Sequence, residues 1–148
     1  MADALSNYME SGVLNLVLRA NTNSFAAPSN VSVSLLANHD TYWGLDAKNG
    51  ETMPEVANAG SYARVTLGAP ANATWNEVNA NGATSNASVV TFPTATAHWG
   101  MVSGVALVTS ATHGAGKILF HGALTIARDI SSGDTFKFNT GDLDITLT

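Results

Sequence analysis

The 148-residue chain contains no cysteine, which excludes disulfide bonds and thiolate chemistry. It is also poor in charge: Asp, Glu, Lys and Arg make up 11% of the residues, less than half of the usual fraction. Between Glu77 and Lys117 no residue carries a formal charge. Thr, Ser, Asn and Gly take the place of charged residues, a composition typical of strands and turns. A surface with few charges also loses little hydration energy when it docks against another protein.

The same composition disfavours two classes of partner. The net charge is −5 and there is no basic patch, so we expect no nucleic-acid partner. Apolar runs such as residues 105–108 are short, so we expect no membrane-spanning segment. The first residues carry acidic side chains and no basic ones, unlike a secretory signal.

Sequence signatures of catalysis are missing as well. There is no GxSxG and no HExxH motif. The GAGK stretch at Gly114–Lys117 lacks the other residues of a phosphate-binding loop and predicts a plain hairpin loop. Asp142 and Asp144 would share one strand face, where a solvent-facing pair is favoured over a calcium site. Four histidines lie at spacings that define no local metal site: His39, His98, His113 and His121. We therefore expect no enzyme activity, no cofactor and no metal.

The N-terminal part predicts a helix at residues 3–18. Leu5, Tyr8, Met9 and later apolar residues recur at helical spacing, Asp3 suits the N-cap position, and Arg19 suits the C-terminal end of the helix dipole. Residues 21–30 then break the helix with Asn, Ser and Pro.

From residue 31 onward the apolar period changes to two. Val31, Val33 and Leu35 alternate with serines, which predicts a half-buried strand. Gly100 and Gly104 indicate a bend or bulge in a later strand, and Gly122 indicates an interruption in the next. Segments around Phe136–Phe138 and Leu143–Leu147 predict a C-terminal hairpin. Three N-x-S/T triplets are interpreted as turns and not as glycan sites: they begin at Asn30, Asn72 and Asn86.

One helix followed by seven or eight short strands predicts a mainly β fold, a β-sandwich or a jelly-roll-like fold with one N-terminal α-helix. The length fits a single domain over residues 1–148, with the helix at 3–18 and the sandwich at 31–148. Within the charge-free stretch, Val90, Phe92, Val105 and Leu107 are expected to face the core. The rest of that stretch is expected to be strand surface that neighbouring subunits shield.

Three loop aromatics are the candidate partner-contact residues. Tyr42 and Trp43 lie in a long irregular segment, and Trp75 lies in an Asn- and Ala-rich loop. Trp and Tyr are enriched at interface centres, although rings that cap the ends of the sandwich core are the favoured interpretation. Trp99 begins a strand and is expected in the core.

The order of the segments resembles a family of small tailed-bacteriophage virion structural proteins. The resemblance rests on the helix LSNYMESGVLNLVLR, the strand VSVSLL, the segments GSYARVTLGAP and LFHGALT, and the closing SSGDTFKFNTGDLDITLT. Members are labelled tail-fibre proteins in some phages, while other small β-rich virion proteins decorate capsids. The resemblance implies a virion location.

Two virion functions follow as expectations. The first is a capsid cement or decoration protein, which binds the major capsid protein or other virion proteins and stabilises the assembled lattice by linkage. The alternative is a tail-fibre or host-glycan-binding module, in which Trp43 and Trp75 would stack on sugar rings. In both cases copies of the chain are expected to form a dimer or trimer.

Overall fold

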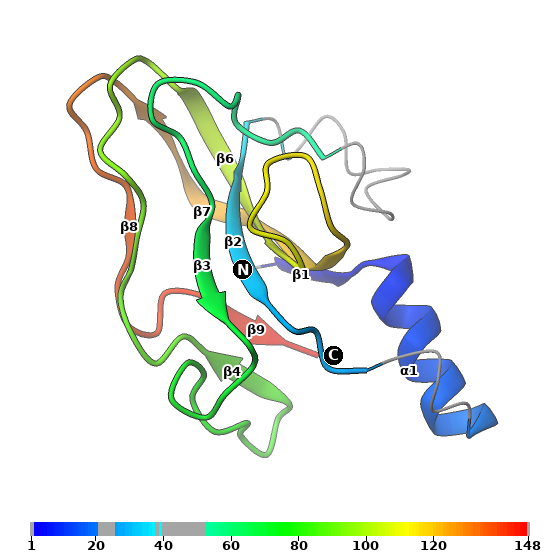
Figure 1. Ribbon diagram of the computed structural model, residues 1–148. Helices are drawn as coiled ribbons and strands as arrows, with labels where there is room; N and C mark the ends of the chain where they lie inside the picture. The colour runs from blue at the N-terminus through cyan, green and yellow to red at the C-terminus, as the bar shows by residue number, and fades with distance from the viewer. Residues whose placement is uncertain (1, 21–25, 38, 40–52, 148) are drawn as a thin grey trace.

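The structure, a computed structural model, describes residues 2–20, 26–37, 39 and 53–147 (Figure 1). In these residues the chain is mainly β with one helix, as predicted. Strands β1, β7, β6, β2 and β3 form, in that order, an antiparallel sheet, while β4 pairs with β9 and β5 with β8. The elements are β1 (Ala2–Leu5), α1 (Asn7–Arg19), β2 (Val31–Leu36), β3 (Val65–Gly68), β4 (Ala83–Ser85), β5 (Val90–Thr91), β6 (Gly100–Val108), β7 (Ile118–Ile130), β8 (Lys137–Phe138) and β9 (Asp144–Thr146).

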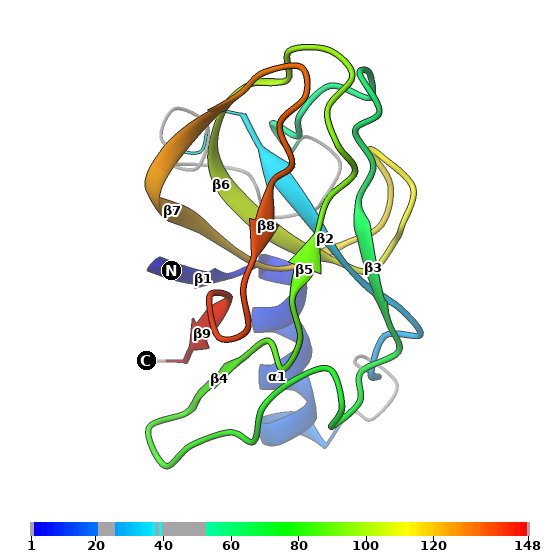
Figure 2. The same ribbon diagram turned by 90° about the vertical axis from the view of Figure 1, so that its left-hand side faces the viewer.

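The two short strand pairs make a second layer over one face of the large sheet, which gives a sandwich-like arrangement. Figure 2 shows β5 and β8 in front of the sheet. The main core lies between the layers, where Phe92 and Phe138 meet Val33 and Leu35 of β2. The four residues expected to face inward from the charge-free stretch are all buried, and Trp99 is buried at the end of the core.

Strand β2 is buried on both faces and not half-buried as its alternation predicts. The reason is its central position between β6 and β3, with Met53 packed over the far face. Ser32 and Ser34 are fully buried there. Their hydroxyls are satisfied locally, since Ser34 donates to the Ala106 carbonyl at 3.3 Å and Ser32 lies 3.4 Å from the Thr66 hydroxyl.

The helix begins later than the sequence predicts. Asp3 does not cap it, because residues 2–5 pair with β7 as an edge strand. Ser6 is the N-cap, and its hydroxyl accepts a hydrogen bond from the Met9 amide at 3.2 Å. The same hydroxyl donates to the Ile118 carbonyl. One serine therefore ends the strand, starts the helix and ties both to β7.

Strand β6 carries the expected irregularity, because its register with β7 shifts between Val102 and Gly104. A Cβ at Gly104 would lie 2.7 Å from the His39 side chain, so this close approach requires glycine. The interruption expected at Gly122 is absent. Gly122 pairs with Val105 on one side and Asp3 on the other, so β7 runs unbroken through it.

The predicted C-terminal hairpin is wrong, because β8 and β9 pair with different strands. Asn86 lies where the β4–β9 pair and the β5–β8 pair meet. Its side chain is buried, donates to the carbonyls of Ser88 at 2.7 Å and Asn139 at 2.8 Å, and accepts from the Leu143 amide at 2.9 Å. Asn86 is thus more than a turn residue, since it joins the two strand pairs.

Candidate assembly surface

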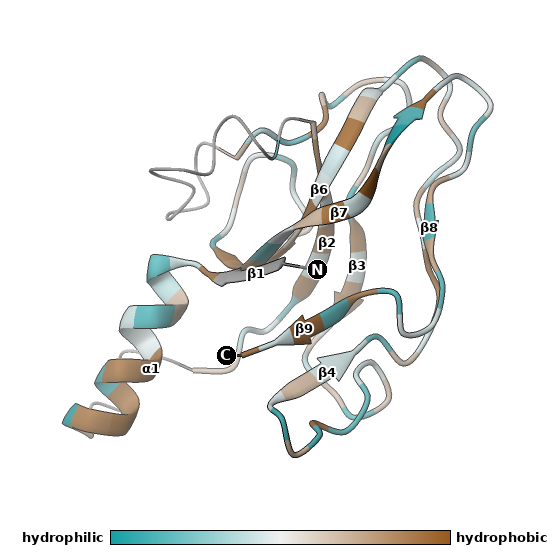
Figure 3. Ribbon diagram, turned by 180° about the vertical axis from the view of Figure 1, so that it is seen from behind, coloured by the Kyte–Doolittle hydropathy of each residue, from teal (hydrophilic) through white to brown (hydrophobic). Residues whose placement is uncertain are grey.

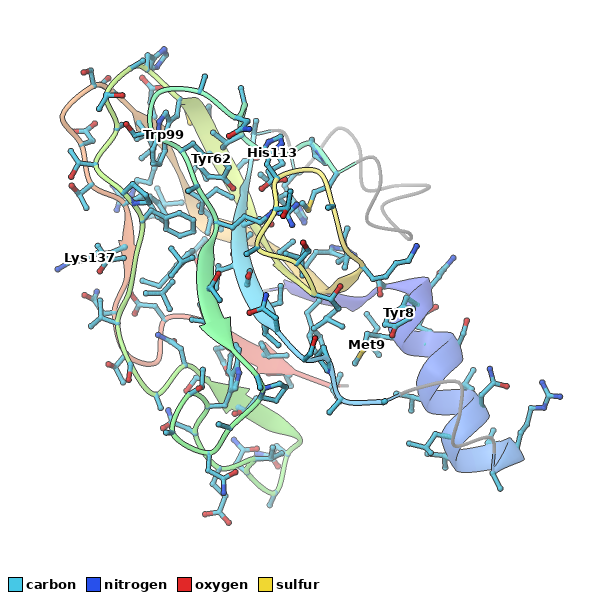
Figure 4. All side chains as sticks on the ribbon, viewed as in Figure 1. Tyr8, Met9, Tyr62, Trp99, His113 and Lys137 are labelled. Atoms are coloured by element: carbon cyan, nitrogen blue, oxygen red, sulfur yellow. The ribbon has the colours of Figure 1, made fainter. Side chains whose placement is uncertain are left out.

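Among the described residues, helix α1 packs against the core through its first turns. Tyr8 and Met9 pack against the main core and Gly12 is buried, and Figure 4 shows Tyr8 and Met9 on the part of the helix nearest the sheet. The second half extends away from the body (Figure 1). It carries large apolar side chains that are 39–74% exposed: Val13, Leu14, Leu16, Val17 and Leu18.

Most residues of this half-helix are apolar (brown in Figure 3), and Asn15 and Arg19 make its polar side. A helix that is apolar all round is normally buried, and a helix of this length is marginal in water without packing. The five exposed side chains leave about 4–8 kcal/mol of burial free energy unused, at the usual value for a fully buried aliphatic side chain. The second half of α1 is therefore a candidate contact surface.

A cavity of about 310 Å³ opens at the base of the helix. Its walls come from α1, β2, β4, β6, β7, β9 and the segments before β2 and β4, and they are almost entirely apolar. The residues that define it here are Met9, Trp75, Val78, Leu119, Phe120 and Leu147. We call this cavity the apolar groove.

Trp75 also borders a second cavity, of about 620 Å³, with polar residues in its wall. Asn72, Asn76 and Glu77 lie around the indole, together with Val78. The ring is half-buried and packs against the main core. Trp75 therefore caps the core and lines both cavities, while its contact with a partner stays a prediction. Tyr42 and Trp43 lie outside the described residues.

An ion pair is buried where β3 meets the loop between β6 and β7. Arg64 and Glu55 form a bidentate pair with both nitrogen–oxygen distances at 2.7 Å, and their side chains are 0% and 3% exposed. The remaining guanidinium nitrogen donates to the carbonyls of Ser110 and Ala115, both at 2.8 Å. Arg64 therefore holds the β6–β7 loop by both of its ends.

The carboxylate of Glu55 collects further donors. The Tyr62 hydroxyl donates to it at 3.0 Å and accepts from the Leu35 amide at 2.9 Å, and the Gly114 amide donates at 3.2 Å. Burial, reinforced by the negative charge of Glu55, raises the pKa of Tyr62. Figure 4 shows Tyr62, Trp99 and His113 gathered at this end of the sheet. The GAGK stretch forms the expected hairpin loop between the antiparallel strands β6 and β7, and its Gly114 amide is hydrogen-bonded to Glu55.

The histidines do not converge. His98 pairs with Asp129 at 2.7 Å on the surface, His113 contacts the Val56 carbonyl at 2.9 Å, and the rings of His39 and His121 lie 6.0 Å apart. Burial and the neighbouring His39 lower the pKa of His121 to about 4. Within the described ranges no three His, Asp or Glu side chains are placed to share a metal ion.

Asp142 accepts from the Asn139 amide at 2.8 Å and so stabilises a turn.

Two features escaped the sequence analysis. The exposed face of α1 had a signal, because Leu14 and Leu18 fall outside the apolar face that the first turns define and leave the second half of the helix only a narrow polar side, made of Asn15 and Arg19. The Glu55–Arg64 pair had no sequence signal. Nothing in the nine-residue separation of these two charges distinguishes a buried ion pair from two unrelated surface charges.

None of the helices in the described residues is long and apolar enough to cross a membrane. Residues 4–146 match the family model described as podophage GP4 fiber I protein gp80. The match confirms the expected tailed-phage virion family, and with it a structural protein located in the virion. No curated protein matches the chain.

Proposed function

We propose, because the chain belongs to the podophage GP4 fiber I protein gp80 family, that it is a non-catalytic subunit of a virion fibre. In this role it packs against copies of itself and against neighbouring virion proteins. The observation that carries the proposal is the second half of α1, whose exposed apolar side chains need a protein partner.

Two further features support an assembly role. The strands enclose a common hydrophobic core, while the second half of the helix extends away from them (Figure 1). The large charge-free stretch lowers the cost of covering the remaining strand surface, because few charged groups have to lose their water.

The location on the virion is tested by labelling. Gold-conjugated antibody against the purified chain, imaged on intact phage by electron microscopy, is expected to mark the fibres. The matched control is the same antibody absorbed beforehand with excess protein. Antibody label distributed over the capsid would favour capsid decoration over the fibre role. Absence of the chain from purified virions would reject both roles.

Capsid decoration is the second candidate, and the same charge-poor surface supports it. Many copies would then bind the major capsid protein only in its assembled lattice and stabilise that lattice by linkage. Capsids that lack this protein would disassemble at a higher temperature after the purified chain is added. An unchanged disassembly temperature, with no chain recovered on the capsids, would contradict this role.

Host-glycan binding is a further activity that a fibre subunit would carry, and the polar cavity beside Trp75 supports it. The half-buried Trp75 ring lines this cavity together with Asn72, Asn76 and Glu77, which places hydrogen-bonding groups beside an aromatic side chain. Binding on a glycan array is expected to weaken on Asn72→Ala and Glu77→Gln, which leave Trp75 in place. Ile126→Ala, at a residue that lines neither cavity beside Trp75, is the control. Equal binding by all these variants would contradict a glycan site there.

A further inference from the structure

We propose that two copies of this chain exchange their helices. In this arrangement the apolar second half of α1 from one copy lies in the apolar groove of the other, and the reverse contact completes a two-fold dimer. The partner of the proposed assembly role is thus a second copy of the same chain. The dimer itself does not depend on the proposed function, which is needed only to place the dimer in the virion.

The donated face has the spacing of a groove-binding helix. Leu14, Val17 and Leu18 stand at positions i, i+3 and i+4 and are 57%, 69% and 74% exposed. These positions share one side of a helix and are the usual anchors of helix-in-groove recognition. The groove's volume of about 310 Å³ accepts a few such side chains while the helix backbone stays outside.

The helix cannot fill the groove of its own copy. Its first turn forms part of the groove wall through Met9, and the Ser6 cap holds that turn against β7. A straight helix of this length, about 20 Å, then carries its second half away from the strands (Figure 3). The second half of α1 can therefore enter such a groove only in another copy.

Charge is complementary at the far end of the contact. Arg19 closes the helix and is exposed, with its guanidinium hydrogen-bonded to Asn15 at 3.2 Å. Glu77 is exposed and borders the polar cavity next to Trp75 and Val78, which also line the apolar groove. A helix seated in the groove brings its cationic end to this acidic rim.

The contact is apolar on both sides, because the exposed aliphatic side chains of the donated face would cover a groove wall that is almost entirely apolar. A two-fold exchange uses each helix and each groove once and leaves none open.

Because the chain has no cysteine, single cysteines test this contact directly. Leu18→Cys protein is mixed with Val78→Cys protein, equilibrated under reducing conditions and then oxidised. A disulfide-linked heterodimer is expected to be the main product. Leu18→Cys mixed with Ile126→Cys is the control, since Ile126 is a similarly exposed aliphatic residue on β7 that lines neither the apolar groove nor the polar cavity.

Sedimentation equilibrium measures the same contact without cross-links. Leu14→Asn with Leu18→Asn is expected to weaken dimerisation at least about tenfold, whereas Ile126→Asn leaves it unchanged. Arg19→Glu and Glu77→Lys are each expected to weaken it, and the double charge reversal to restore part of the loss. Circular dichroism of every variant confirms that the strands are folded.

Three results would overturn the exchange: a monomer at about 100 µM, a dimer indifferent to the Leu14→Asn/Leu18→Asn change, or cross-links between two Leu18→Cys chains alone, which would indicate paired helices. Fibre labelling without the Leu18–Val78 cross-link would reject the exchange and leave the proposed function standing. The cross-link in a protein absent from virions would reject only the proposed function.

Discussion

Glu55 and Arg64 show how a charge-poor protein uses the charges that it has. Their buried pair supplies partners to a tyrosine hydroxyl, a loop amide and two loop carbonyls, so the β6–β7 loop is held by side chains distant in sequence. With all these groups satisfied, the cluster stabilises the fold and offers no free group for catalysis.

Removing one partner of this pair is expected to be costly. Glu55→Gln leaves the buried guanidinium without a counter-charge and should lower the free energy of unfolding by about 3–5 kcal/mol, measured by urea denaturation. Asp129→Asn is the control, because its pair with His98 is about half exposed and should contribute less than about 1 kcal/mol. Equal effects of the two changes would contradict a buried structural role.

His121 gives the fold a sensitivity to acid. Its pKa falls from 6.5 to about 4 on folding, so the unfolded chain binds the extra proton first. Its contribution to stability is complete above about pH 6.5 and is lost as the pH falls toward 4, with a loss on the order of 1–2 kcal/mol for this partly exposed group. His121→Gln should therefore flatten the unfolding free energy between pH 6.5 and 4 relative to the parent protein. Parallel profiles would show that another group is responsible.

Asn86 acts at the scale of strands, since it links the β4–β9 pair to the β5–β8 pair. Asn86→Ala removes three hydrogen bonds and leaves buried backbone groups without partners, which should lower stability by about 3 kcal/mol in thermal or urea unfolding. Asn72→Ala, in a similar triplet on the surface, should change stability little. If both variants unfold alike, the junction does not depend on Asn86.

Local sequence patterns predicted whether a segment is a helix or a strand better than they predicted which strands pair with one another. The period-two segments became strands, and Gly104 marked a real bulge. Ser32 and Ser34 read as an exposed face because sequence alone does not reveal that strands and Met53 cover β2 on every side. Asp3 was expected to start the helix because its pairing with Gly122 of β7 is remote in sequence.

The C-terminal hairpin failed for the same reason. A turn between two apolar segments is the strongest local signal for pairing, yet β8 and β9 find better partners in β5 and β4. The candidate surface was only partly predictable as well: Trp75 was identified from its residue type, but the groove beside it exists only when α1, β7 and β9 come together.

Taken as a whole, the protein is a strand scaffold that presents one helix. Self-association by that helix should make its thermal stability depend on concentration, because binding favours the folded state by mass action. The melting temperature should rise over a hundredfold increase in protein concentration, measured by calorimetry. The melting temperature of the Leu14→Asn/Leu18→Asn variant should depend less on concentration, and a parent protein that melted at one temperature throughout would contradict association through α1.

The pairing of β4 with β9 also sets an order of events during synthesis. Strand β4 leaves the ribosome well before its partner and waits for several seconds at ordinary elongation rates, about 5–20 residues per second. During that interval the lower half of the second layer is open, so the groove wall that β9 supplies is missing. The helix exchange proposed above would therefore have a complete groove only after β9 has been translated.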